Sequence, residues 1–111
     1  MAVTSPGLDP VFHAISDPTR REVVTLLSQA PRRAGELAEA CGVSAPAMSK
    51  HLRVLLEAGV VVDARVATDA RARVFHLRPE SVVALQAWLD QLQAEWNRQL
   101  ASFKRHVEER S

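Results

Sequence analysis

The side chains best suited to a chemical task gather in one stretch of the chain, residues 44–58. If this stretch is a helix, Ser49, Lys50 and Arg53 lie on one face, opposite a run of apolar residues. Lysine and arginine donate hydrogen bonds to guanine, serine pairs with several bases, and the major groove of B-DNA admits a helix. Taken alone, the same face is equally typical of a solvated amphipathic helix. We expect DNA contacts from Ser44, Ala47, Ser49, Lys50, His51 and Arg53.

Basic residues continue into the segment that follows. Residues 44–78 contain six basic and three acidic side chains, a net charge of +3, whereas the parts of the chain before and after carry −1 each. A locally positive surface attracts a polyanion, and phosphate contacts fix position without reading sequence. We assign phosphate contacts to Arg71 and Arg73, and leave Arg65 unassigned because two nearby aspartates weaken its field.

Residues that could support catalysis or metal binding occur only singly and not in the groups that such sites need. Ser49 and His51 are two apart, so on a helix they point away from each other and form no nucleophile–base pair. No glycine-rich phosphate loop occurs. Cys41, His13, His51 and His106 do not form a spaced cluster of metal ligands. We therefore expect neither an enzyme nor a bound metal or cofactor.

Residues that typically begin or end helices mark the bounds of the elements that hold these side chains. Asp17 and Pro18 are typical of a helix start, and the apolar pattern continues to about Ala30, where Pro31 ends it. A shorter helical pattern precedes it, around residues 10–15.

The next two helices lie close together. The first runs from Gly35 to Cys41 and ends at Gly42, although Ala34 is a poor cap for it. The second begins after Ser44 and runs to Ala58, followed by Gly59. Two helices joined by a short turn with glycine predict a helix-turn-helix over about residues 35–58.

After Gly59 the pattern changes from helix to strand. Residues 60–66 and 73–77 are rich in β-formers and are separated by the polar turn region Thr68–Asp69. We expect a two-stranded hairpin over about residues 60–77, the wing of a winged helix-turn-helix.

The last segment, about residues 79–110, predicts one long helix. Apolar residues recur along it every three or four positions, as one seam that ends at Val107. A helix of about 30 residues is ~45 Å long, more than so small a domain can cover. A second copy of the chain is the simplest partner, and a bent helix folded back on its own domain is the alternative. The predicted dimer interface comprises Phe12, Leu85, Leu89, Leu92, Trp96, Leu100 and Phe103.

Length and composition are consistent with these elements. The 111 residues, 47% hydrophobic and 24% charged, suit a single domain over 1–111, mainly helical with a small hairpin: about five helices and a two-stranded wing. The lone cysteine and the absence of a basic, apolar leader indicate the cytoplasm. No run approaches the ~20 apolar residues that a membrane span needs, so no membrane partner is expected.

Three motifs, in order, closely resemble the arsenic-repressor (ArsR) family of bacterial regulators. They are VFHAISDPTRREVVTLL at 11–27, GELA at 35–38 and SAPAMSKHL at 44–52. Tryptophans at 88 and 96 make the tail similar to the metal-independent, autorepressor-like branch. The resemblance implies a winged-helix homodimer, paired through its first and last helices. Such a dimer represses a nearby operon, often including its own gene, at a palindromic double-stranded operator.

Departures from the family pattern also carry information. Many relatives have glutamine where this chain has Ala45, so a base contact made there by relatives is absent. Metal-sensing relatives place cysteines where this chain has Arg33 and Gly35, neither of which ligates metal. Two alternatives stay open: a repressor of the same fold that responds to metal or thiol chemistry, and a winged-helix module that binds protein and not DNA.

Overall fold

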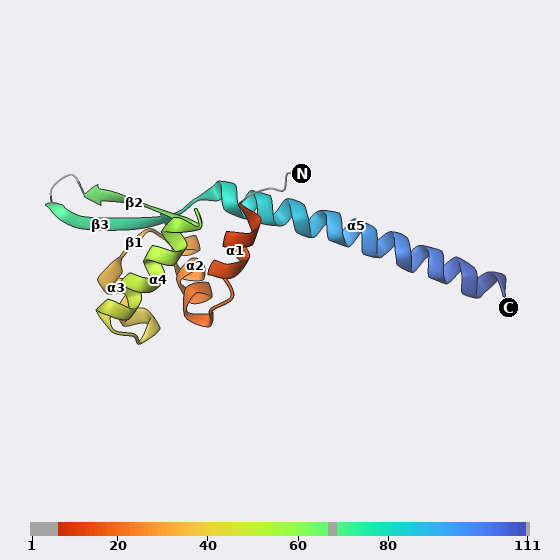
Figure 1. Cartoon of the computed structure of the whole chain (residues 1–111), viewed down its shortest axis with the longest axis horizontal. Helices are drawn as coiled ribbons and strands as arrows, with labels where there is room; N and C mark the ends of the chain where they lie inside the picture. Colours follow the sequence, from red (N-terminus) through yellow and green to blue (C-terminus); the bar gives the residue numbers. More distant parts are fainter. Residues whose placement is uncertain (1–6, 67–68, 111) are drawn as a thin grey trace.

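The computed structural model describes residues 7–66 and 69–110, which form a compact head and one long projecting helix (Figure 1). The principal extents are 70 × 33 × 21 Å. In chain order the elements are α1 (Leu8–Ala14), α2 (Pro18–Gln29), β1 (Arg32–Arg33), α3 (Ala34–Cys41), α4 (Ala45–Glu57), β2 (Val61–Val66), β3 (Asp69–Leu77) and α5 (Pro79–Glu109).

The predicted helix ends are confirmed at four positions, because each depends on local chemistry. The Asp17 carboxylate accepts a hydrogen bond from the Arg20 backbone N–H (3.0 Å), and the Ser44 hydroxyl accepts one from that of Ala47 (3.2 Å). Gly42 and Gly59 follow α3 and α4 with φ of 68° and 76°, where a side chain would be strained.

The sheet differs from the expected two-stranded hairpin. It is antiparallel in the order β1-β3-β2, because β1 adds a third strand through Arg32 opposite Phe75 and Arg33 opposite Val74. The strand β3 also begins at Asp69, earlier than predicted. Asp69 therefore belongs to a strand and not to the turn, and Thr68 lies outside the described residues.

The α3 helix also begins one residue earlier than predicted, at Ala34. Its first turn is stabilised by Glu36, whose carboxylate accepts the backbone N–H of Arg33 at 2.8 Å. This contact takes the place of the side-chain cap that Ala34 could not provide.

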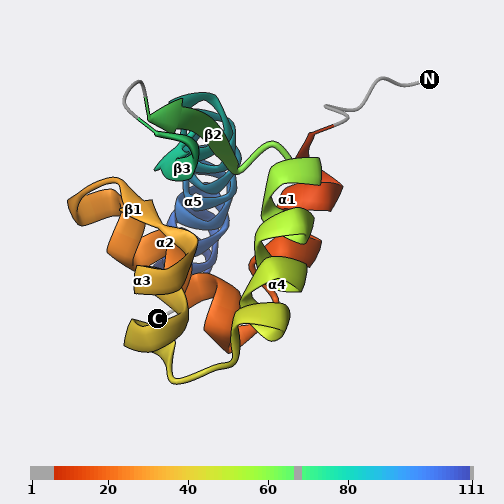
Figure 2. The same cartoon turned by 90° about the vertical axis from the view of Figure 1, so that its left-hand side faces the viewer.

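The hydrophobic core lies wholly inside the head. Figure 2 shows α4 with α1 on one side of the head and α2 and α3 on the other, below the strands β2 and β3. Apolar residues of α2 and α4 that the sequence placed inward are buried or packed against this core. The buried set is Val11, Ala14, Val23, Leu27, Leu37, Ala38, Met48, Leu52, Leu55, Val60, Val61 and Phe75.

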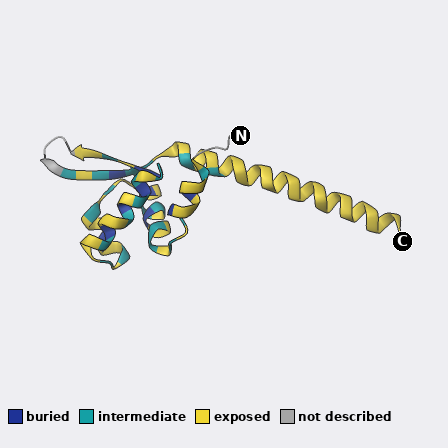
Figure 3. Ribbon diagram, viewed as in Figure 1, coloured by how far each residue is buried: buried dark blue, intermediate teal, exposed yellow. Residues whose placement is uncertain are grey.

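The long helix α5 contributes no buried residue (Figure 3). It leaves the head after Arg78 and extends without folding back, which overturns the alternative of a bent helix packed on its own domain. At its base Trp88 meets Phe12 of α1 edge-to-face, with ring centroids 5.2 Å apart. Across the described ranges, no helix is both long enough and apolar enough to span a membrane.

Candidate nucleic-acid interface

The helix-turn-helix holds α4 at a fixed angle on the head. Residues 42–44 connect α3 to α4, and α4 is anchored from below by Met48, Leu52 and Leu55, all buried. Because the buried side chains occupy one stripe of the helix, the opposite side faces solvent. The structure thus anchors α4 on the core along one side and exposes the other side.

Most of the predicted α4 contacts lie together on this exposed side. Ser49, Lys50 and Arg53 are exposed, and Ala47 is half-buried. Ser44 is exposed at the start of the helix, where its hydroxyl is already used as the cap. Ser49 and Arg53 are one helical turn apart and face the sheet side, where both line a cleft, whereas Lys50 does not line it.

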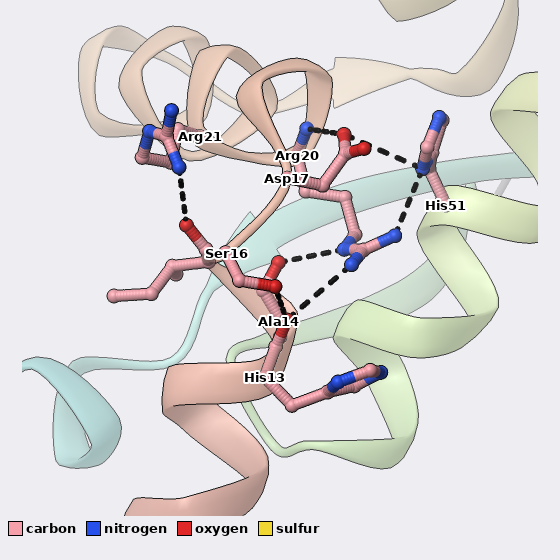
Figure 4. A network of polar contacts seen from close by, with 8 residues as sticks. His13, Ala14, Ser16, Asp17, Arg20, Arg21 and His51 are labelled. Carbon is pink, nitrogen blue, oxygen red and sulfur yellow. Dashed lines mark hydrogen bonds and ion pairs between the residues drawn. The ribbon is translucent and has the colours of Figure 1, made fainter.

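His51 faces the other way, toward the junction of α1 and α2 (Figure 4). Its Nδ1 lies 3.2 Å from Nη1 of Arg20 and 3.9 Å from the Asp17 carboxylate. Since guanidinium can only donate, Nδ1 is the acceptor in this contact. The predicted DNA contact at His51 is untested, but it would have to use Nε2.

Arg20 is the centre of this network. Its Nε donates to the Ala14 carbonyl at 2.6 Å and its Nη2 to the His13 carbonyl at 3.3 Å, so it closes the end of α1 while it touches α4. The backbone N–H of Arg20 is also the main reason that the Asp17 pKa is lowered. One side chain of α2 therefore joins α1 to α4.

On the wing, the predicted arginines have different surroundings. Arg73 is held by Asp63, Nε to Oδ2 at 2.7 Å, and lies over the ring of Phe75 at 5.3 Å. Arg65 is directly opposite Arg73 in the strand register. Arg71 lies in β3, and its side chain is outside the described part of the chain. Asp63, one of the two aspartates expected to weaken the positive field of Arg65, therefore forms an ion pair with Arg73 instead.

A cleft of about 580 Å³ separates α4 from the sheet. Its polar lining is Arg33 of β1, Ser49 and Arg53 of α4, and Arg73 of β3. In the sequence, Arg33 stands out only as a position where metal-sensing relatives have cysteine. The pair of arginines directly before α3 is the sequence signal for a basic residue here, and the lining of the cleft shows that Arg33 is the one that faces α4.

The predicted interface residues form one apolar surface on α1 and α5. Leu92, Trp96 and Phe103 are 51%, 56% and 67% exposed. Leu89, Leu100 and Phe12 are also exposed, and Leu85 is half-buried.

Cys41 is half-buried in α3. Burial, and then the nearby Glu22 carboxylate, raises the pKa of its thiol. Within the residues that the structure describes, no three His, Cys, Asp or Glu side chains come together as a metal site.

Comparison with known proteins gives a consistent result. Residues 15–63 match a helix-turn-helix domain family. The chain is 37% identical over 100 residues to the HTH-type transcriptional regulator Rv2034 of Mycobacterium tuberculosis, covering 90% of this chain and 88% of that one. It is 45% identical over 58 residues to the transcriptional repressor SdpR of Bacillus subtilis, covering 52% of this chain and 64% of that one.

A solved structure matches over almost the full length. An ArsR-like transcriptional regulator from Rhodococcus sp. RHA1 is 35% identical, covers 97% of each chain and superposes with a TM-score of 0.79. The protein is thus a winged helix-turn-helix transcriptional regulator and not an enzyme, as the exposed α4 and the wing indicate. It belongs to the ArsR family.

Proposed function

We propose that the protein is a homodimeric repressor that binds a palindromic DNA operator through α4 and the wing. The observation that carries this proposal is the exposed, basic side of α4, which is fixed by three buried residues and lies beside the arginine-lined cleft. A groove-reading helix needs both features: donors for base edges and a rigid orientation. That one matching relative is named a transcriptional repressor supports repression as the outcome.

Lys50 is the proposed base-reading side chain, because it projects from the exposed side of α4 without lining the cleft. Lys50→Ala should weaken binding to a duplex selected from a random pool by ~1 to 3 kcal/mol and relax base preference at one position. Lys104→Ala, which removes the chain's other lysine from the distant α5, is the matched control. Equal losses from both variants would contradict a role in base reading.

Homodimerisation is supported by α5. The α5 helix has no buried residue and a continuous exposed apolar seam, which soluble monomers rarely show, and a second copy would bury it with two-fold symmetry. A two-fold protein meets DNA symmetrically, so the operator should be an imperfect palindrome with half-sites about one or two helical turns apart. A single asymmetric footprint would contradict this.

We further propose that release from DNA requires neither metal binding nor oxidation and reduction of a cysteine. The side chains at 33 and 35 do not ligate metal, and a disulfide switch within one chain needs a second thiol. A dimer can pool ligands, for example His13 and His106 from α1 and α5. Zinc, cadmium, arsenite and peroxide should therefore be titrated into the complex, beside Cys41→Ser. A stoichiometric metal that lowers affinity tenfold would favour the metal-responsive repressor instead.

The remaining alternative is a winged-helix module that binds protein. A gel mobility shift of duplex DNA, measured at several salt concentrations, distinguishes DNA binding from protein binding. Displacement of counterions from phosphates makes DNA binding fall steeply with salt. A chain that binds no duplex at low salt would refute the proposal of a DNA-binding repressor.

A further inference from the structure

We propose that the cleft between α4 and the sheet holds one phosphodiester strand of the bound duplex, and that Arg33 is a phosphate contact there. This inference rests on the proposed DNA binding and adds to it a site and a residue. We call the group Arg33, Ser49, Arg53 and Arg73 the arginine cleft.

The charge of the arginine cleft favours an anionic ligand. Arg33 and Arg53 make no hydrogen bond or ion pair through their guanidinium groups in the ranges 7–66 and 69–110, so both are available to a ligand. Arg73 is already paired with Asp63, and the Glu36 carboxylate accepts only the backbone N–H of Arg33. Two unpaired guanidinium groups in one cleft, with a third beside them, match an anion with several acceptor oxygens.

The geometry of a DNA duplex favours a phosphate as that anion. Major and minor grooves are separated by the backbone of one strand. If α4 lies in the major groove and the wing in the adjacent minor groove, that backbone must pass between α4 and the sheet. The arginine cleft lies there, lined from one side by Ser49 and Arg53 and from the other by Arg33 and Arg73. Its ligand is therefore a phosphate rather than a base edge.

Arg33 differs from its neighbour Arg32 in where its side chain lies. Successive residues of a strand point to opposite faces, and only Arg33 lines the cleft. The Arg32 side chain instead donates to the Leu26 carbonyl at 3.4 Å and to Gln29 Oε1 at 3.2 Å. Arg32 is thus a control of the same residue type, on the same strand, that should not contact DNA.

The primary test is the salt dependence of binding by the full chain. Each phosphate contact contributes about 0.9 to the slope of log K against log salt, so Arg33→Ala should reduce the slope by about 2 per dimer. Affinity should fall about tenfold at ~0.15 M salt, equally for a selected duplex and a scrambled one. Arg33→Lys should restore the slope, because it keeps the charge, and Arg32→Ala should leave it unchanged.

The location is tested by phosphate ethylation interference. With wild type, ethylation of phosphates next to the α4 half-site should block binding, and with Arg33→Ala that interference should disappear. A wild-type slope in Arg33→Ala, or a loss confined to the selected duplex, would overturn the inference. In both cases wild type still binds DNA, so the proposed function would survive. A wild-type protein that binds no duplex would refute both proposals. An unchanged melting temperature of Arg33→Ala establishes that the variant folds.

Discussion

Trp96 offers the sharpest test of how α5 is used. Its side chain is 56% exposed, near the middle of an apolar seam that residues 7–66 and 69–110 leave uncovered. If a second copy buries this seam, Trp96→Ala should weaken the dimer strongly. The helix itself should persist, because alanine is a better helix former than tryptophan.

The expected magnitude follows from exposed area. A tryptophan buries up to about 250 Å², so 56% exposure leaves about 140 Å² for the partner. At about 25 cal/mol/Å² that is about 3.5 kcal/mol per copy and about 7 kcal/mol for both copies. Alanine retains part of this area, and the partner covers the tryptophan incompletely. We therefore expect the free energy of dimerisation to weaken by about 4 kcal/mol, which raises the dimer Kd about a thousandfold.

Sedimentation equilibrium measures the change directly, against a single-chain mass of 12.2 kDa. Leu92→Glu should dissociate the dimer as well, whereas Ala94→Glu, which adds the same charge on the far side of α5, should not. A wild type that is monomeric at micromolar concentration, or a dimer Kd that Trp96→Ala leaves within about threefold, would refute dimerisation through α5.

Three further outcomes follow from the head. Arg20→Ala should lower the free energy of unfolding by about 1 to 3 kcal/mol because it removes the Arg20 hydrogen bonds to the Ala14 and His13 carbonyls, and thermal melts should show less effect for Arg21→Ala, which loses one exposed bond. The lowered pKa of Asp17 contributes stability above its ordinary value near 4 that is lost as pH falls through the lower folded value, so Asp17→Asn should flatten the acid side of a stability–pH curve. The raised pKa of the Cys41 thiol should make alkylation slow at neutral pH, and Glu22→Gln should speed it by removing a charge that disfavours the thiolate; identical rates in the two proteins would contradict that cause.

The parts of the fold that the sequence predicted well are those fixed by neighbouring residues. Asp17, Ser44, Gly42 and Gly59 act within a few positions of the helix ends they define, so their types alone located α2, α3 and α4. The periodicity of α5 was equally readable, because a 31-residue helix repeats its signal many times.

What the sequence missed depends on distant partners. The two-residue strand β1 exists only because Arg32 and Arg33 pair with β3, about 40 positions later, and no local pattern announces so short a strand. The orientation of His51 toward Arg20, and the pairing of Arg73 with Asp63, likewise arise from tertiary contacts. The helix periodicity placed His51 on the flank of α4 but could not identify what it meets.

The order β1-β3-β2 also governs which surfaces can associate with a second chain. Both outer strands have an open edge, and an open edge is a template for strand addition and aggregation. Here one outer strand has two residues, and the other carries Asp63 and Arg65 and shifts register between Arg65 and Val66. Short length, charged side chains and an irregular register each discourage edge-to-edge pairing. These features disfavour self-assembly through the sheet, which agrees with the proposed dimer contact through helices and not through a shared, growing sheet.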